Sequence, residues 1–190
     1  MKQKLTEKDF ADAAAIIGCE EAVVKAVAEV ESGRRGGFCP DDFPVTLFEG
    51  HVFHRYTDGL YSEKNPDISH QKWTTEFYGK TWYEERNRLD RAIRLDRTAA
   101  LMSASWGRFQ IMGFNFPACG CTSVQQFVNY NCESEREQGR LFVEYIFHVC
   151  LDDELRDKRW HDFARKYNGP MYQKNRYAEK LETAYNKFKV

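Results

Sequence analysis

The segment from Ser134 to Leu151 constrains the fold of this chain more than any other. Its apolar residues recur at the three- and four-residue spacing of one helix side. They are Leu141, Phe142, Tyr145, Ile146 and Val149, and Phe147 and Cys150 widen that side until it nearly surrounds the helix. A helix that is apolar nearly all round is normally buried. We therefore predict a central buried helix with other helices packed around it.

Further helices are predicted from capping signals and apolar periodicity. Their expected ranges are 6–18, 20–33, 81–101, 105–112, 122 onward, 153–167 and 172–189. Between residues 33 and 67, glycines, three prolines and the short apolar run 45–48 indicate loops with a short strand or two. The chain is thus expected to be one mainly α domain, with a small β-hairpin insertion in its N-terminal third.

Composition excludes several classes of protein. Hydrophobic residues at 42% and charged residues at 30% are globular values, so the chain is not mainly disordered. No apolar stretch reaches about 18 residues, which argues against a membrane-spanning helix. The apolar run near the N-terminus, residues 13–18, is too weak for a signal peptide, so no export signal is expected.

The six cysteines suggest disulfides or a metal site, but neither interpretation is favoured. Disulfides are typical of exported proteins, and this chain is large enough to fold without them. No C-x-x-C is present, and the H-x-x-H at His51 and His54 has no glutamate between its histidines. We expect reduced thiols that fill core space, no metal and no cofactor.

Glu31 is the first candidate for a chemical role. It lies four residues after Val27 and seven after Val24, so it points to the apolar side of its helix, in the last turn. Apolar neighbours and the negative end of the helix dipole both raise the pKa of a carboxyl group, as a general acid requires. Alternatively, Glu31 is a carboxylate at the core edge, satisfied by backbone N–H groups or an arginine. Glu29, four residues after Lys25, is expected to form an ordinary exposed ion pair with it.

Two further motifs carry polar groups on turns. Gly107 would allow a ligand to approach the backbone closely, and Gln110 offers a donor and an acceptor to a hydroxyl or acetamido group. Tyr167 and Asn168 offer a phenol and an amide just before Gly169. Each motif alone is weak, because similar turns occur in many proteins.

The order of these motifs resembles the catalytic signature of the lysozyme-like superfamily, as in goose-type lysozymes and soluble lytic transglycosylases. The matching residues are Glu31-Ser32, then Ser105-Trp106-Gly107-x-x-Gln110-x-Met112, then Tyr167-Asn168-Gly169. Over residues 11–189 the chain is similar to the N-acetylmuramidase family of phage endolysins that act on Gram-negative hosts. One departure is Pro170, where transglycosylases often have a second glycine.

The resemblance implies a lysozyme-like fold and hydrolysis of the β-1,4 bond between N-acetylmuramic acid and N-acetylglucosamine in peptidoglycan. Glu31 would be the acid, and Tyr167 and Asn168 would lie near it. The segment with Ser105, Trp106, Gly107 and Gln110 would begin a helix that cradles the sugar. The glycan strand is the implied partner. We expect a single domain over residues 1–190, with no separate cell-wall-binding domain.

An inverting hydrolase also needs a base, about 6.5–9.5 Å from the acid. Glu49 is the leading candidate, since it lies in the predicted β insertion between Phe48 and Gly50. Alternatively, Glu49 only holds its loop through hydrogen bonds, and Asp41 or Asp42 is the base. The aromatic side chains Trp73, Tyr78, Trp82 and Trp106 are possible sugar platforms, although most aromatics in such a domain belong to the core.

Two other functions stay open at the level of sequence. A lytic transglycosylase would need only the one glutamate, and a wall-binding module would have kept the fold without the activity. For an endolysin without a signal peptide, synthesis in the host cytoplasm and action in the periplasm after membrane permeabilisation are expected. We expect a monomer with no nucleic-acid partner.

Charge is unevenly distributed along the chain. Residues 156–190 have a net charge of +6 and residues 1–155 a net charge of −7. The last predicted helix has an apolar side and several basic residues, among them Lys187 and Lys189. This pattern is compatible with contact to an anionic membrane or wall surface. Alternatively, the apolar side docks on the core and leaves the lysines in water.

Overall fold

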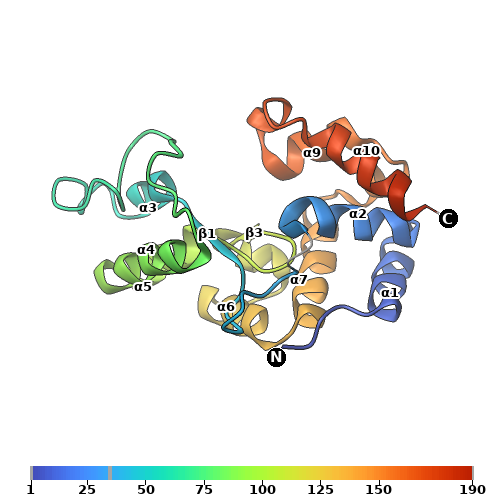
Figure 1. The fold of residues 1–190 in the computed structure, drawn as a ribbon, viewed down its shortest axis with the longest axis horizontal. Coiled ribbons are helices and arrows are strands. Elements are labelled where there is room, and N and C mark those ends of the chain that lie inside the picture. Colours follow the sequence, from blue (N-terminus) through green and yellow to red (C-terminus); the bar gives the residue numbers. More distant parts are fainter. Residues whose placement is uncertain (1, 34–35, 190) are drawn as a thin grey trace.

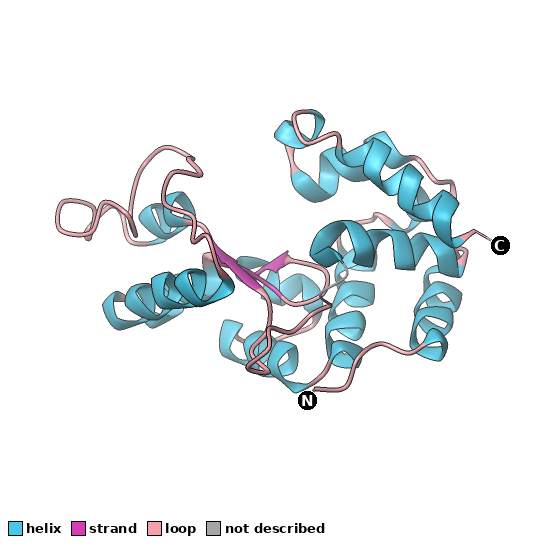
Figure 2. Cartoon of the chain, viewed as in Figure 1, coloured by secondary structure: helices cyan, strands magenta, loops and turns pink. Residues whose placement is uncertain are grey.

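The computed structural model describes residues 2–33 and 36–189, and the fold is mainly helical with one small sheet (Figure 1, Figure 2). The α-helices are α1 (Glu7–Ile17), α2 (Glu21–Ser32), α3 (Gly50–Tyr56), α4 (Trp82–Leu95), α5 (Arg97–Met102), α6 (Val124–Glu133), α7 (Glu135–His148), α8 (Asp152–Arg156), α9 (Trp160–Asn168) and α10 (Tyr177–Phe188). Two 3-10 helices are η2 (Gly113–Cys119) and η3 (Pro170–Gln173). The strands are β1 (Thr46–Phe48), β2 (Ala104–Trp106) and β3 (Ile111–Met112).

The predicted central helix is confirmed as α7. Leu141, Phe142 and Ile146 are fully buried, and α7 packs against α1, α6 and η2. The ring of Phe109 stacks on Phe142 with centroids 4.2 Å apart, which joins the β2–β3 turn to this helix. Phe147 is 42% exposed, so the expectation of an almost all-round apolar helix is wrong on that side.

The first two helices form as predicted. Thr6 caps α1 and completes a capping box with Asp9, and Gly18 ends the helix in the left-handed region. In α2 the side chains of Val23, Val24 and Val27 are buried, and the helix packs against both α1 and α10. This packing fixes the direction of α2 and with it the position of its last turn.

The predicted helix over 105–112 is wrong, because this segment forms the β2–β3 hairpin. Gly107 and Gln110 adopt φ values of +72° and +48°, and these left-handed residues turn the chain back on itself. Strand β1 pairs antiparallel with β2, so the sheet order is β1-β2-β3. The cross-strand partners Leu47, Ser105 and Met112 form one row across the sheet. Successive residues of a strand point to opposite faces of the sheet, so the strand residues next to this row face the core.

Several predicted boundaries also differ. The 81–101 helix divides at Asp96, whose extended backbone ends α4 and whose side chain caps α5. The 153–167 helix divides near Lys158, which has a φ of +56°. The last helix begins only at Tyr177, after η3. Helix α3 forms within the segment 33–67, which the sequence predicts as loops with a short strand or two.

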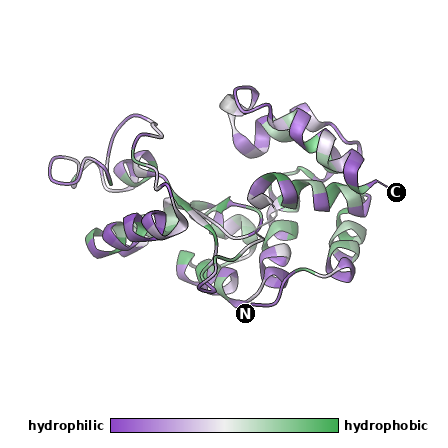
Figure 3. Cartoon of the chain, viewed as in Figure 1, coloured by the Kyte–Doolittle hydropathy of each residue, from purple (hydrophilic) through white to green (hydrophobic). Residues whose placement is uncertain are grey.

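The sheet lies between two groups of helices (Figure 1). Helices α3, α4 and α5 lie on one side with the long 57–81 loop, and α1, α2, α7, α9 and α10 lie on the other. Most of α4 is hydrophilic (Figure 3), yet its buried pair Glu85–Arg88 joins it to the sheet. Glu85 accepts from the Phe48 backbone N–H at 3.1 Å, and Arg88 donates to the Phe48 carbonyl at 3.3 Å. These two hydrogen bonds fix the end of β1 against α4.

Within residues 2–33 and 36–189, no helix has the length and apolar character needed to cross a membrane. Cys119 and Cys121 lie buried as free thiols, in agreement with the expectation that cysteines fill core space. Cys150 is exposed and does not have that role.

Candidate active site

A cleft of about 360 Å³ lies where the end of α2, the sheet and the end of α9 meet. Its lining residues are Glu31, Leu47, Glu49, Ser105, Gln110, Ile111, Met112, Asn115, Tyr145, Tyr167 and Asn168. The row formed by Leu47, Ser105 and Met112 supplies one wall. The structure therefore brings together six of the eight predicted site residues, from four separate parts of the chain.

Glu31 is half-buried at the end of α2. Burial raises the pKa of its carboxyl group to about 8, against a usual value of 4.5, and a hydrogen bond with the Asn168 side chain offsets part of this shift. The Tyr177 hydroxyl, from α10, donates to Glu31 Oε1. At neutral pH this carboxyl group is therefore mostly protonated, as expected from its place on the apolar side of the helix.

Arg108 fixes the end of the helix that carries Glu31. From the β2–β3 turn, its Nη1 donates to the Ser32 hydroxyl at 3.0 Å and to the Gly33 carbonyl at 2.9 Å. Its backbone N–H donates to Gln138 Oε1 at 2.7 Å. A cation that donates to the last carbonyls of a helix stabilises that helix end. The hairpin and α2 are thus held together beside the cleft.

Glu49 lies at the junction of β1 and α3, and both its carboxylate oxygens contact side chains. The Tyr78 hydroxyl donates to Oε1 at 2.7 Å. His51 Nδ1 lies 3.2 Å from Oε2, but among the described residues neither of these two buried atoms has a hydrogen-bond partner. Burial and the nearby Glu49 raise the pKa of Tyr78, so its phenol stays a donor. The Glu49 backbone N–H donates to the Ser103 carbonyl at 2.9 Å. These contacts fix the carboxylate at the cleft wall.

The alternative bases Asp41 and Asp42 are not among the residues that line the cleft. Asp41 is exposed and accepts from the Phe43 backbone N–H at 3.2 Å. Asp42 accepts from the backbone N–H of Lys2 at 3.1 Å, at the N-terminal end of the chain. Of the three acidic candidates, Glu49 alone contributes to the cleft lining.

Ser105 and Gln110 form a hydrogen-bonded pair in the cleft. The Ser105 hydroxyl donates to Gln110 Oε1 at 2.8 Å. Gln110 Nε2 donates to the carbonyls of Gly107, at 2.8 Å, and Val45, at 3.2 Å. The Gln110 amide therefore holds the hairpin turn against β1 in a single orientation, and both side chains line the cleft from a strand and a turn rather than from a helix.

Trp106 and Gly107 lie outside the cleft lining. Trp106 is 2% exposed, and its indole N–H donates to the Leu101 carbonyl at 3.1 Å, so it belongs to the core. At Gly107 the close approach is made by buried side chains of the protein itself. A Cβ there would lie 2.5 Å from Asn131 Oδ1 and 2.7 Å from Gln138 Cδ. Of the other expected platforms, Trp73 and Trp82 are exposed outside the cleft and Tyr78 binds Glu49.

Gly107→Ala is expected to lower the free energy of unfolding by about 2–4 kcal/mol, because it combines a left-handed backbone with a clash against Asn131 and Gln138. Gly120→Ala is the matched control, since Gly120 has a φ of +70° but nothing within 4 Å of the added Cβ. It should cost only about 1 kcal/mol. Urea denaturation measures both. Equal losses would show that the close approach at Gly107 does not matter.

Tyr167 and Asn168 lie at the end of α9, as expected near Glu31. The Tyr167 hydroxyl donates to the Phe109 carbonyl at 2.7 Å, and its ring packs on Phe163 with centroids 5.0 Å apart. Burial and the nearby Glu31 carboxyl group raise the pKa of the Tyr167 phenol. Tyr167 thus joins α9 to the hairpin turn, and Asn168 contacts the acid itself.

Sequence reasoning missed Tyr177 as a partner of Glu31 and assigned it only to the apolar side of the last helix. A buried tyrosine hydroxyl needs a polar partner, and that requirement was the available signal. Tyr177, Leu181 and Tyr185 are buried, and α10 packs against α2. The apolar side of α10 is therefore docked on the core.

The expected Glu29–Lys25 pair is wrong: Glu29 pairs with Lys187 at 2.6 Å, and Lys25 pairs with Glu7 and Glu21.

Two comparisons with known proteins find relatives of this chain. The family model described as "Muramidase: N-acetylmuramidase" matches residues 20–189. The crystal structure of Burkholderia AP3 phage endolysin is similar at a TM-score of 0.85 and 38% identity, over 97% of this chain and 70% of that chain. Comparison with curated proteins finds no match. The family model covers most of the chain, so this chain belongs to the N-acetylmuramidase family.

Proposed function

We propose that this enzyme hydrolyses the β-1,4 bond between N-acetylmuramic acid and N-acetylglucosamine, with Glu31 as the general acid and Glu49 as the general base. Family membership implies that its substrate is peptidoglycan. The observation that carries the proposal is that two carboxyl groups with different surroundings line one cleft. Glu31 keeps its proton near neutral pH because its pKa is about 8, and Glu49 is held through Oε1 by the Tyr78 hydroxyl, while its Oε2 has no hydrogen-bond partner among the described residues.

In the proposed reaction, Glu31 gives its proton to the glycosidic oxygen as the bond from that oxygen to C1 of N-acetylmuramic acid breaks. A water molecule attacks C1, and Glu49 takes the proton that this water loses. The products are a reducing N-acetylmuramic acid end and a free hydroxyl on N-acetylglucosamine. Exchange with solvent then returns the proton to Glu31. Attack from the opposite face makes the reaction inverting.

The sugars are proposed to bind to Ser105, Gln110, Tyr167 and Asn168. Ser105 and Gln110 lie on the sheet wall of the cleft, and Tyr167 and Asn168 lie on the α9 side. A sugar between these walls would have its glycosidic oxygen near Glu31. Trp106 and Gly107 would act only through the hairpin that they stabilise.

One observation favours a lytic transglycosylase as the second candidate. Glu49 Oε1 already accepts a hydrogen bond from Tyr78, and a transglycosylase does not require that carboxylate. In that reaction the sugar's own hydroxyl attacks C1 and an anhydro ring forms instead of a reducing end.

Mass analysis of digested peptidoglycan separates these reactions. Hydrolysis gives reducing N-acetylmuramic acid ends, each one water heavier than a 1,6-anhydro end. The proposal predicts reducing ends; anhydro ends would establish the transglycosylase, and no new ends at all would indicate a wall-binding module without activity.

We also propose that the enzyme is made in the cytoplasm of the phage's host and acts on the periplasmic wall after the membrane is permeabilised. Similarity to a phage endolysin supports this assignment. The single-domain organisation without a wall-binding domain, the monomeric state and the absence of a nucleic-acid partner remain predictions.

A further inference from the structure

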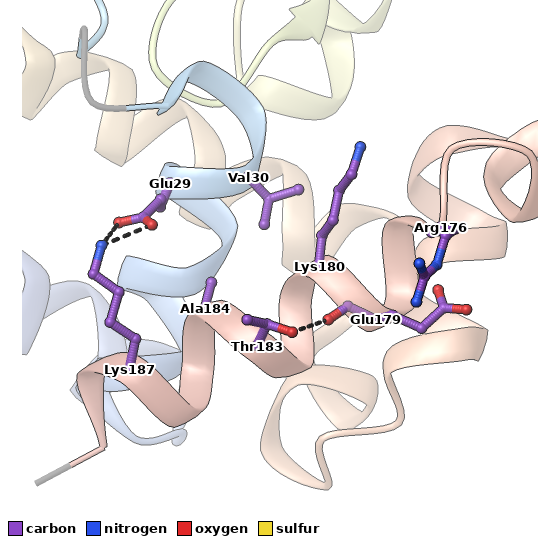
Figure 4. A pocket seen from close by; sticks show the side chains of 8 residues that line it. All are labelled: Glu29, Val30, Arg176, Glu179, Lys180, Thr183, Ala184 and Lys187. Carbon is purple, nitrogen blue, oxygen red and sulfur yellow. Dashed lines mark hydrogen bonds and ion pairs between the residues drawn. The ribbon is translucent and has the colours of Figure 1, made fainter.

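A second hollow lies between α2 and α10 (Figure 4). This α2/α10 groove has a volume of about 500 Å³. Val30 and Ala184 supply its apolar lining, and charged side chains lie along both its ends. None of its lining residues belongs to the cleft that holds Glu31 and Glu49.

The groove lies between the two helices that carry Glu31 and its hydrogen-bond partner Tyr177. On α2, Val30 lines the groove and the next residue is Glu31. At the start of α10, Arg176 lines the groove and the next residue, Tyr177, donates its hydroxyl to Glu31. Consecutive Cα atoms are about 3.8 Å apart, so the groove begins one residue from the acid on α2 and one residue from the acid's hydrogen-bond partner at the start of α10.

The charges of the groove are only partly compensated within the protein. Lys187 is paired with Glu29 at 2.6 Å at one end. Among the described residues, neither Arg176 nor Lys180 forms an ion pair, and the groove lining also contains the carboxylate of Glu179. Lys180 extends from α10 past Val30, and both cations are exposed to solvent. An anionic ligand would therefore find two cations that form no ion pair, against the carboxylate of Glu179, beside an apolar lining.

Peptidoglycan supplies such a ligand at this place. Its N-acetylmuramic acid rings each carry a short peptide, and the carboxylates of that peptide are anionic at neutral pH. The ring that holds the scissile C1 atom is also the ring that bears the peptide, so the peptide has to leave the cleft close to Glu31. The cleft, at about 360 Å³, is near the lower limit for small-molecule sites and suits sugars better than sugars with a branching peptide.

We propose that the α2/α10 groove binds the anionic peptide attached to N-acetylmuramic acid, with Lys180 and Arg176 contacting its carboxylates. This inference rests on the proposed function, because it assumes that Glu31 acts on a bond of that sugar. The groove then contributes to recognition of the natural polymer and takes no part in bond cleavage. It also gives part of the basic C-terminal segment a specific ligand.

The test compares two soluble substrates prepared from the same peptidoglycan. Endopeptidase digestion gives glycan strands that keep their peptides, and amidase digestion gives strands without them. Released reducing ends are measured against substrate concentration for the wild type and for Lys180→Gln/Arg176→Gln. Lys174→Gln is the control, since it removes one positive charge from an exposed residue of the same basic segment outside the groove.

For the double variant, the half-saturating concentration of peptide-bearing strands should rise about 3- to 10-fold, the loss expected of two exposed charge contacts. The double variant should keep the wild-type kcat and the wild-type half-saturating concentration of peptide-free strands. Lys174→Gln should match the wild type on both substrates. The peptide assignment would be overturned if the half-saturating concentration of the double variant is unchanged or rises equally for both substrates. It would also be overturned if Lys174→Gln shows the same rise. If the wild type releases no new sugar ends from either substrate, the proposed function itself fails.

Discussion

Glu31→Gln is expected to lower kcat for peptidoglycan hydrolysis by about 10²-fold or more. The substitution keeps the shape of the side chain and its place beside Tyr177 and Asn168, but it removes the proton that the leaving oxygen needs. The measurement is the release of reducing ends from purified sacculi at saturating substrate. Glu21→Gln is the matched control, since it makes the same chemical change in the first turn of the same helix. It should retain wild-type activity.

The loss of activity in Glu31→Gln must occur without loss of the fold. The pKa of Glu31 is raised from 4.5 to about 8 in the folded chain, so the folded state retains a proton that the unfolded state loses. The free energy of unfolding of the wild type should therefore fall as pH rises from about 4.5 to 8. The glutamine variant lacks this term and should be at least as stable as the wild type above pH 8. A folded variant with near wild-type activity would refute the role of Glu31.

Glu49→Gln is expected to lower hydrolysis by about 10²-fold or more, because the attacking water loses its proton acceptor. The amide can still accept from Tyr78, so the loop should stay in place. Asp41→Asn, outside the cleft, is the control and should retain most of the activity.

The outcome for Glu49 also decides between the two reactions. A folded Glu49→Gln enzyme that works at the wild-type rate would remove the base from the account and favour the one-glutamate reaction. If Glu49→Gln unfolds while Asp41→Asn or Asp42→Asn is folded but inactive, the base is that aspartate instead. Circular dichroism distinguishes a folded variant from an unfolded one.

Apolar spacing and capping residues correctly predicted the helices that depend on these short-range patterns. The apolar spacing in α7 and the valines of α2 gave correct helices, and the same spacing placed Glu31 on the apolar side. Thr6 and Thr81 cap helices as their sequence contexts indicate. A carboxyl group at such a position is buried as a direct result of helix periodicity.

The sequence could not show the hairpin or the network around the acid. Gln110 has a left-handed backbone, a conformation that glutamine does not favour, and the turn depends on hydrogen bonds to Val45 and Gly107. Tyr177 is 146 residues from Glu31, and only the packing of α10 on α2 brings the two together. Contacts of this kind depend on tertiary structure and leave no periodic signal.

The sequence pattern also could not decide what the apolar side of the basic C-terminal helix contacts. Its apolar residues fitted both a membrane-surface helix and a core helix, and burial of Leu181 and Tyr185 places them in the core. Lys187 is engaged by Glu29, and Lys189 lies over the Tyr185 ring at 5.6 Å. Contact between an anionic membrane or wall surface and this helix remains a prediction, and it would have to use the lysines rather than the apolar side.

The central claim is that Glu31 is a protonated acid at the pH of the reaction. It is tested most directly by NMR titration of glutamate side-chain carboxyl carbons in the wild type, with Glu31→Gln used to assign the resonance. This one resonance is expected to titrate with a pKa of about 8. A Glu31 resonance that titrates near its usual value of 4.5 in the folded protein would contradict it.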